Sequence, residues 1–274
     1  MVSIRQALAE ASLPGDAGRL EAEVLLCHCL GESRSYLYTW PERELAEDCL
    51  ARYRALLAAR REGKPVAYLT GRREFWSLEL AVDEHTLIPR PETEVLVDWA
   101  LNLELQADAR VADWGTGSGA IALALASERP AWTVIASDRS AAALHVAASN
   151  RDELGLQNVE LLQASWGDGQ VGFGYQLIAS NPPYVAEGDA HLEQGDLRFE
   201  PDSALVSGGD GLDDICQITR DAFACLSPGG WLLMEHGFDQ AAAVRDLLAA
   251  SGYVEVATRE VPAGQERISG GRRP

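Results

Sequence analysis

The sequence lacks the features that would mark a membrane, secreted or disulfide-bonded protein. None of its 274 residues belongs to an apolar run of the ~18 residues that a membrane-spanning helix needs, and no charged start precedes an apolar segment as in a secretion signal. Its five cysteines are scattered and form no Cys-x-x-Cys pair, which is typical of reduced thiols in the cytosol. We therefore expect a cytoplasmic protein with reduced cysteines at Cys27, Cys29, Cys49, Cys216 and Cys225.

Basic residues are also scarce. There are 23 of them against 42 acidic residues, so the net charge is −19, and most of the excess falls after residue 100. This balance argues against long duplex nucleic acid as the primary substrate. A protein partner with a basic surface fits the charge better, because opposite charge would speed its encounter.

One short run, Cys27-His28-Cys29, resembles a metal-binding group. Consecutive residues of a helix point in different directions, however, and this run lies in a helical pattern. We expect no metal site.

The order of sequence patterns predicts three regions. Apolar residues recur at helical intervals over residues 3–62, and Gly63-Lys64-Pro65 is predicted to end this helical bundle. Aromatic and alternating residues over 74–82 are typical of a strand or hairpin. The sequence predicts a helical domain at 1–73, a hairpin linker at 74–90 and a larger domain at 91–274.

Strand and helix patterns alternate in the larger domain, without repeats or low-complexity segments. This alternation predicts a largely parallel sheet covered by helices on both faces. Residues 270–274 are the one candidate for a disordered end. The expected strands are 110–114, 132–137, 158–162, 175–180, 230–235, 253–258 and 265–269.

A glycine loop follows the first of these strands. Its spacing is Gly-x-Gly-x-Gly at residues 115–119, which differs from the Gly-x-Gly-x-x-Gly of dinucleotide-binding dehydrogenases. Glycines let the main chain approach a ligand closely, although such a loop alone is a weak signal. The next strand ends in Asp138, which is suited to accept hydrogen bonds from ribose hydroxyls, although an isolated Asp there is more often a helix cap.

Asn181-Pro182-Pro183-Tyr184 follows the strand 175–180. The Asn181 side-chain oxygen and the Pro182 carbonyl are two acceptors that can converge on one amide or amino nitrogen, and Tyr184 offers an aromatic face. Alone, this motif is equally consistent with a strand-ending turn. In the order strand, glycine loop, helix, strand, Asp138, helix, strand and then this motif, it predicts an S-adenosylmethionine-dependent methyltransferase acting on a nitrogen.

These motifs together resemble the bacterial release factor glutamine methyltransferases of the HemK/PrmC type. The similarity extends over nearly the whole chain and includes Gly71-Arg72-Arg73-Glu74-Phe75-Trp76, residues 87–94 and Arg198-Phe199-Glu200-Pro201. The resemblance implies an α/β fold: a small helical domain that docks the substrate, a β-hairpin connector and a seven-stranded, Rossmann-like class I methyltransferase domain. It also implies the substrate, the glutamine of the Gly-Gly-Gln motif in class-1 peptide chain release factors.

The resemblance assigns roles to particular residues. It implies that Asp138 holds the ribose of S-adenosylmethionine, that Trp166 lines the adenine pocket and that Asn181 lies against both cofactor and substrate. Asn181, Pro182 and Tyr184 are the expected catalytic residues, and the glutamine binds at Asn181, Pro182, Pro183 and Tyr184. The methionine part of the cofactor is expected on Gly115, Thr116, Gly117, Ser118 and Gly119.

Two positions depart from the family pattern. The family usually has an acidic residue where Ser165 stands, so either Ser165 or Asp168 is a candidate for the adenine contact. Trp114 replaces an aliphatic residue and is expected to pack in the core.

Further residues have both a functional and a structural interpretation. Phe75, Arg90 and Glu200 match the family and are candidates for shaping the mouth of the site, while an ion pair with Glu92 or Glu94 is the structural alternative for Arg90. His236 stands beside Glu235 as in a catalytic pair, but we expect a structural role for it.

Two rival functions share some of these features. An adenine-N6 methyltransferase of DNA or RNA would use the same acceptors, and a non-catalytic adaptor would use the glycine loop only as a scaffold. The acidity disfavours the first, and the joint presence of Asp138 and Asn181 disfavours the second. We expect a monomer that binds release factors and has no direct contact with nucleic acid or membrane.

Overall fold

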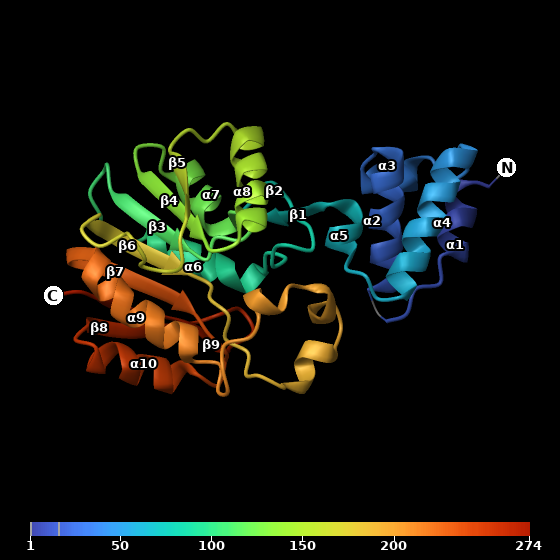
Figure 1. Ribbon diagram of the computed structural model, residues 1–274. Coiled ribbons are helices and arrows are strands. Elements are labelled where there is room, and N and C mark those ends of the chain that lie inside the picture. Colours follow the sequence, from blue (N-terminus) through green and yellow to red (C-terminus); the bar gives the residue numbers. More distant parts are fainter. Residues whose placement is uncertain (1, 16) are drawn as a thin grey trace. The chain divides into compact units, whose positions relative to one another are not determined.

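The computed structural model describes residues 2–15 and 17–274. The chain divides into two compact units, and the segment Glu193–Phe199 belongs to the first unit although it lies far along the chain. Figure 1 labels helices and strands of both units. Within the described residues no helix is both long enough and apolar enough to cross a membrane. The domain bounds 1–73, 74–90 and 91–274 stay predictions.

The first unit is helical, as the sequence predicts. Ser3 begins α1 with a capping box, in which the Ser3 hydroxyl accepts from the Gln6 N–H and the Gln6 side chain accepts from the Ser3 N–H. Apolar side chains of all four longer helices, among them Ile4, Leu25 and Tyr53, form one core. The helices are α1 (Ile4–Glu10), α2 (Gly18–Leu30), α3 (Arg34–Thr39), α4 (Glu47–Arg61) and α5 (Val66–Thr70).

The predicted end of the helical bundle at Gly63-Lys64-Pro65 is wrong, because α5 follows it. Pro65 is the N-cap of α5. A proline is tolerated there because an N–H at the start of a helix has no partner within the helix. The late segment Glu193–Phe199 is held here by polar contacts: Arg60 Nη1 donates to Asp196 Oδ1 at 3.0 Å, and Arg198 Nη2 donates to the Glu62 carbonyl at 2.7 Å.

The predicted hairpin is confirmed, with strands β1 (Arg72–Phe75) and β2 (Leu78–Ala81). Trp76 and Ser77 form its two-residue turn with φ of 53° and 61°, the left-handed values that such tight turns require. Asn150 ties β2 to the rest of the second unit, to which both belong. Its side chain accepts from the Ala81 N–H at 2.6 Å and donates to the carbonyls of Ala81 and Ser118, so the hairpin is fixed beside the glycine loop.

The second unit contains the seven-stranded, mostly parallel sheet that the sequence predicts. The strand order is β5-β4-β3-β6-β7-β9-β8. The strands from β5 to β7 are parallel, whereas β9 is antiparallel to both of its neighbours. The bounds are β3 (Arg110–Trp114), β4 (Thr133–Asp138), β5 (Val159–Gln163), β6 (Tyr175–Ser180), β7 (Leu226–Glu235), β8 (Val254–Glu260) and β9 (Glu266–Arg272).

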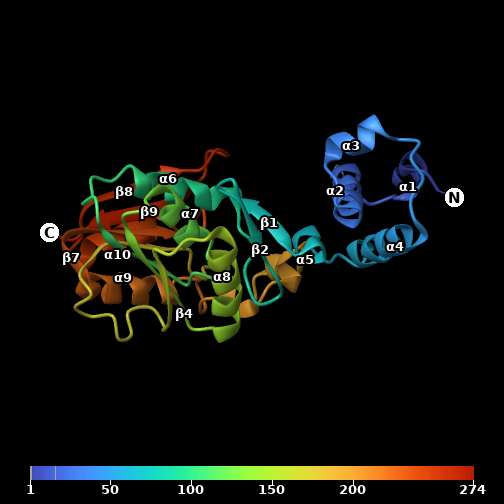
Figure 2. The same cartoon turned by 90° about the horizontal axis from the view of Figure 1, so that it is seen from above.

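Helices cover both faces of this sheet (Figures 1 and 2). Successive residues of β3 alternate between two cores: Val111 packs with α6 and α7, while Ala112 and Trp114 pack with α9 and α10. The helices are α6 (Glu94–Leu101), α7 (Ala120–Glu128), α8 (Ala141–Leu154), α9 (Asp213–Cys225) and α10 (Ala241–Ala250). Short 3₁₀ turns are η1 (Pro91–Thr93), η2 (Ala190–Glu193), η3 (Leu197–Phe199) and η4 (Asp202–Ala204).

The prediction that residues 270–274 form a disordered end is wrong. Gly270 and Gly271 are buried in β9, which pairs with β7 on one side and β8 on the other. The glycines allow close packing of the sheet, since a Cβ on Gly270 would collide with the Leu233 side chain and lie 2.8 Å from the Leu232 carbonyl oxygen. Glycine is thus used here for packing, not for flexibility.

Gly270→Ala is therefore expected to lower the free energy of unfolding by about 1–3 kcal/mol, the usual cost of overpacking. The main-chain oxygen of Leu232 cannot move aside without disturbing the ladder. Urea unfolding of the full chain measures the effect. Gly209→Ala is the matched control, because a Cβ there meets no atom within 4 Å. Equal midpoints for the two variants would contradict the packing argument.

Candidate active site

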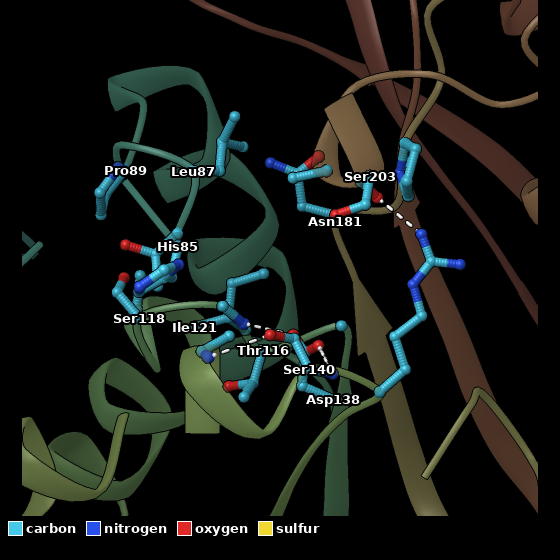
Figure 3. Close-up of a pocket in the computed structure, with 18 of the residues that line it drawn as sticks. His85, Leu87, Pro89, Thr116, Ser118, Ile121, Asp138, Ser140, Asn181 and Ser203 are labelled. Carbon is cyan, nitrogen blue, oxygen red and sulfur yellow. Dashed lines mark hydrogen bonds between the residues drawn. The ribbon is translucent and has the colours of Figure 1, made fainter. Parts of the chain in front are cut away.

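A cavity opens where three neighbouring parallel strands end. The glycine loop follows β3, Asp138 ends β4 and Asn181 follows β6, so the topology brings together residues that lie far apart in the sequence. The empty space, open to solvent, is about 940 Å³. In Figure 3, Asp138, Thr116 and Ser140 gather in one part of the view, with Asn181 and Ser203 in another.

The glycine loop lies close to an aromatic ring. Gly115 has φ of 74°, and a Cβ on it would lie 3.1 Å from the Trp166 ring. The Gly115 N–H donates to the Ser137 carbonyl at 2.8 Å and the Gly117 N–H donates to Asp138 Oδ2 at 3.0 Å. Glycine at 115 therefore leaves room for both the left-handed turn and the ring.

Asp138 is fixed by the main chain around it. Its Oδ1 accepts from the Ser140 N–H at 2.8 Å and its Oδ2 accepts from Gly117. Asp138 thus supports the start of α8 and lines the cavity as well. Because each carboxylate oxygen has two lone pairs, both retain the capacity to accept from a ligand hydroxyl.

Trp166 is held in a left-handed conformation, with φ of 44°, on one wall of the cavity. Its indole N–H donates to Asp214 Oδ1 at 3.0 Å, and the Ser207 hydroxyl donates to the other oxygen of Asp214. Ser165 also lines the cavity, while Asp168 is not among its lining residues. Trp114 is fully buried and donates to Gln170 Oε1, so it packs in the core as expected.

Asn181 presents a buried acceptor to the cavity. Its Nδ2 donates to Thr93 Oγ1 at 3.2 Å, whereas its Oδ1 is buried and has no hydrogen-bond partner among the described residues. Buried polar atoms are almost always hydrogen-bonded, so an unsatisfied oxygen beside a cavity indicates a place for a donor. Within residues 2–15 and 17–274 no main-chain hydrogen bond uses the Pro182 carbonyl either.

The rest of the motif is less exposed to the cavity. Pro183 lines it, but Pro182 and Tyr184 are not among the lining residues. The Tyr184 hydroxyl donates to Glu235 Oε1 at 3.2 Å, and burial raises the pKa of Tyr184 above its usual value. The stacking of Tyr184 on a substrate amide stays a prediction.

Glu235 and Thr93 were not predicted as site residues. Thr93 lines the cavity and donates its hydroxyl proton to Glu235 Oε2 at 2.6 Å. Burial raises the pKa of Glu235, while the hydroxyls of Thr93 and Tyr184 act in the opposite direction. No sequence pattern indicates this group, because Thr93 and Tyr184 lie on separate elements, 142 and 51 residues from Glu235.

His236, by contrast, is a structural residue, as expected. It is fully buried, with Nδ1 2.8 Å from the Gly237 carbonyl and Nε2 2.8 Å from Ser269 Oγ. Because a carbonyl only accepts, Nδ1 carries the proton and Nε2 accepts from Ser269. Burial lowers the pKa of His236.

Arg90 does not pair with Glu92 or Glu94, so the structural alternative for it is wrong. Its Nη2 lies 2.6 Å from Glu200 Oε2, and Glu200 Oε1 accepts from the Ile88 N–H at 3.1 Å. Glu94 instead accepts from the Trp76 N–H. Arg90 lines the cavity, and Glu200 holds it there.

A second buried carboxyl, that of Asp113, is hydrogen-bonded to the glycine loop. Asp113 Oδ2 accepts from the Thr116 hydroxyl at 2.6 Å and from the Ala122 N–H at 3.1 Å, while its Oδ1 has no partner among the described residues. Burial raises the pKa of Asp113 to about 7. The loop conformation is thus supported by a group that titrates near neutral pH.

This pKa predicts a pH dependence of stability. Between about pH 4 and pH 7 this carboxyl binds a proton in the folded state that it lacks in the unfolded state. Its contribution to the free energy of unfolding is therefore largest below pH 4 and is lost as the pH rises through 7. The rise in the pKa of Asp113 corresponds to a loss of roughly 4 kcal/mol at most in the free energy of unfolding. Asp113→Asn should therefore gain stability relative to the natural chain between pH 4 and pH 8. Denaturant unfolding of both chains measures the difference, and a difference that stays constant over this range would contradict the assignment.

Comparison with known proteins agrees with this architecture. Residues 2–71 match the family model "PrmC N-terminal domain" and residues 92–210 match the model "Methyltransferase small domain". The catalytic domain of hMettl16, solved in complex with the MAT2A 3′UTR hairpin 6, has a TM-score of 0.57 at 16% identity, over 82% of this chain and 81% of that one. At that identity the likeness concerns the fold alone.

Relatives at higher identity share the whole length. The chain is 50% identical to a protein of Pseudomonas aeruginosa over 99% of both chains. It is 47% identical to one of Shewanella oneidensis, over 93% of this chain and 90% of that protein, and 44% identical to one of Escherichia coli, over 98% and 97%. All three carry the name "Release factor glutamine methyltransferase".

The fold, the cavity at the strand ends and the matching domain define an enzyme of the methyltransferase class with a Rossmann-like sheet. The N-terminal match and the identity over nearly the full length narrow this class. The chain belongs to the release factor glutamine methyltransferase family.

Proposed function

We propose that this protein transfers a methyl group from S-adenosylmethionine to the side-chain amide nitrogen of a glutamine, the one in the Gly-Gly-Gln motif of class-1 peptide chain release factors. The single observation that carries the proposal is the buried Oδ1 of Asn181 at the cavity, which has no hydrogen-bond partner in the described part of the chain. The name shared by the full-length relatives supports the choice of substrate.

The cavity has features that fit the cofactor. Gly115 of its loop lies beside the Trp166 ring with no room for a side chain, and Asp138 offers fixed acceptors for ribose hydroxyls. In this proposal Gly115 to Gly119 hold the methionine part, Trp166 lines the adenine pocket, and Ser165 is the adenine contact because it lines the cavity where Asp168 does not. Bound there, S-adenosylmethionine would supply an activated methyl carbon.

The residues of the chain have to prepare a poor nucleophile. An amide nitrogen shares its lone pair with its carbonyl, so it needs alignment and stabilisation of the positive charge that develops on it. Asn181 Oδ1 and the Pro182 carbonyl would accept its two N–H groups and fix its direction. Asn181 Oδ1 and the Pro182 carbonyl would keep hold of the N–H groups while the new N–C bond replaces the S–C bond, whose electron pair would stay on sulfur. The proton that becomes acidic on nitrogen would then pass from these acceptors to water, so no strong base is needed.

The proposal extends to the partner and its place. The helical first unit would dock the release factor, and the acidic surface would favour a partner with basic groups. A monomer acting in the cytoplasm, without direct contact to nucleic acid or membrane, is sufficient for this reaction.

The direct test incubates the full chain with labelled S-adenosylmethionine and a purified class-1 release factor, then maps the modified residue by mass spectrometry. We expect one added methyl group on the glutamine of the Gly-Gly-Gln motif, and none on a release factor whose glutamine is replaced by alanine. An adenine-containing oligonucleotide serves as the competing substrate. Label on the oligonucleotide and not on the release factor would overturn the proposal.

A further inference from the structure

We propose that Thr93 and Glu235 are positioning residues that orient the Asn181 carboxamide with its oxygen toward the cavity. This inference rests on the proposed function. The three side chains come from separate elements: Thr93 ends η1, Glu235 ends β7 and Asn181 follows β6. All three belong to the same compact unit.

The two ends of a primary amide have nearly the same size, so packing alone does not decide which end faces a ligand. Hydrogen-bond partners decide it, because the oxygen only accepts and the NH₂ only donates. The partner that Asn181 meets inside the protein is Thr93 Oγ1, at 3.2 Å from Nδ2. The orientation of Asn181 therefore depends on whether this hydroxyl donates or accepts.

Glu235 decides the role of the Thr93 hydroxyl. A hydroxyl has one proton, and that of Thr93 goes to Glu235 Oε2 over 2.6 Å, a length typical of a hydrogen bond to a carboxylate. Thr93 then has only lone pairs for Asn181, which must turn its NH₂ inward and its oxygen outward. The buried carboxylate is itself held by a second donor, the Tyr184 hydroxyl on Oε1.

This relay explains why Asn181 Oδ1 has no partner among residues 2–15 and 17–274. With the amide oriented in this way, the oxygen remains available to an N–H donor in the cavity. The opposite orientation would present an NH₂ group to the substrate N–H groups, and two donors repel. The Thr93–Glu235 pair thus makes the site selective for an amide or amino nitrogen without touching the substrate nitrogen itself.

The test compares two substitutions at position 93 in the full chain, with the release factor as substrate. Thr93→Val removes the hydroxyl at nearly constant volume, and Thr93→Ser keeps it. We expect Thr93→Val to lower kcat by roughly 10- to 100-fold, the scale found for outer partners that orient ligating residues, and Thr93→Ser to stay close to the natural chain. The dissociation constant of S-adenosylmethionine, measured by calorimetry, should be the same in both and confirms that the variants fold.

A second arm uses Glu235→Gln, which keeps the shape but adds a donor. The new NH₂ can donate to Thr93 Oγ1, which frees the threonine proton for Asn181 and favours the wrong amide orientation. We expect a loss in kcat comparable to that of Thr93→Val, with the KM for the release factor little changed.

A double-mutant cycle separates positioning from general structural support. If Thr93 and Glu235 act through Asn181, then Thr93→Val and Glu235→Gln cost nothing further in a chain that already carries Asn181→Ala. The inference is overturned if these substitutions lower kcat in the Asn181→Ala chain by the same factors as in the natural chain. It is also overturned if Thr93→Val and Thr93→Ser have equal turnover. In both cases the proposed function stands. Failure of the natural chain to methylate the glutamine would instead overturn the proposed function and this inference with it.

Discussion

Replacing Asn181 by alanine is expected to lower the turnover of methyl transfer by ~10² or more, the scale of losing one transition-state partner. The reason is the acceptor at Oδ1, which is buried at the cavity and has no partner among the described residues. In the proposed reaction, its loss would leave the amide nitrogen of the substrate with one acceptor in place of two. The lost interaction strengthens as charge develops, so kcat should fall more than KM rises.

The experiment is a single-turnover assay with purified release factor, accompanied by calorimetry with S-adenosylmethionine. Cofactor binding should be close to that of the natural chain, because the glycine loop and Asp138 are untouched. Asn102→Ala is a matched control, since Asn102 is an exposed asparagine whose side chain donates to the carbonyl and the carboxylate of Asp98. Near-normal turnover of Asn181→Ala would remove the acceptor from the account.

Asp138→Ala is expected to act on a different quantity, the affinity for S-adenosylmethionine. Hydrogen bonds to a charged group contribute about 1.5–3 kcal/mol, so the dissociation constant should rise about 10- to 100-fold. Part of the loss comes through the protein itself, since the N–H groups of Gly117 and Ser140 lose their acceptor. The alanine variant would therefore both remove the proposed ribose acceptors and loosen the loop.

Asp138→Asn distinguishes these two contributions. Asparagine keeps one oxygen, so it can retain one main-chain contact while it loses the charge. We expect an affinity between those of the natural chain and the alanine variant, measured by calorimetry with all three proteins. Unchanged affinity in Asp138→Ala would mean that the carboxylate serves only as a cap for α8.

The parts of the site that were predictable from sequence are those that follow directly from strand ends. The glycine loop, Asp138 and Asn181 each come immediately after an apolar strand, and parallel strands bring their carboxyl ends to one edge. Local pattern and topology together therefore place these residues around one cavity. The same local patterns explain why the hairpin and the seven strands were predicted within a few residues of their bounds.

Pairings between distant elements could not be predicted in this way. Glu235 looked like a neighbour of His236, but its contacts are to Thr93 and Tyr184, which only the folded sheet brings near it. Arg90 had two acidic residues close in sequence, yet it pairs with Glu200, 110 residues away. In each case the partner is chosen by tertiary packing, on which sequence spacing has no bearing.

The role of Gly270 and Gly271 was also not predictable, because it depends on the neighbouring strand. A glycine pair near an end is consistent with disorder when viewed alone. In β9 the main chains and side chains of β7 come so close that Gly270 has no room for a Cβ. Glycine is required at position 270 because of the Leu233 side chain and the Leu232 carbonyl oxygen, and both leucines lie far from position 270 in the sequence.

The central claim, that Asn181 captures the substrate carboxamide through its oxygen, is tested most directly by a crystal structure of this protein with the demethylated cofactor and a peptide containing the Gly-Gly-Gln motif. The account predicts the glutamine nitrogen ~3 Å from Asn181 Oδ1, with Asn181 Nδ2 still on Thr93. A complex in which Asn181 Oδ1 points away from the glutamine nitrogen, or binds the main chain of the protein, would contradict it.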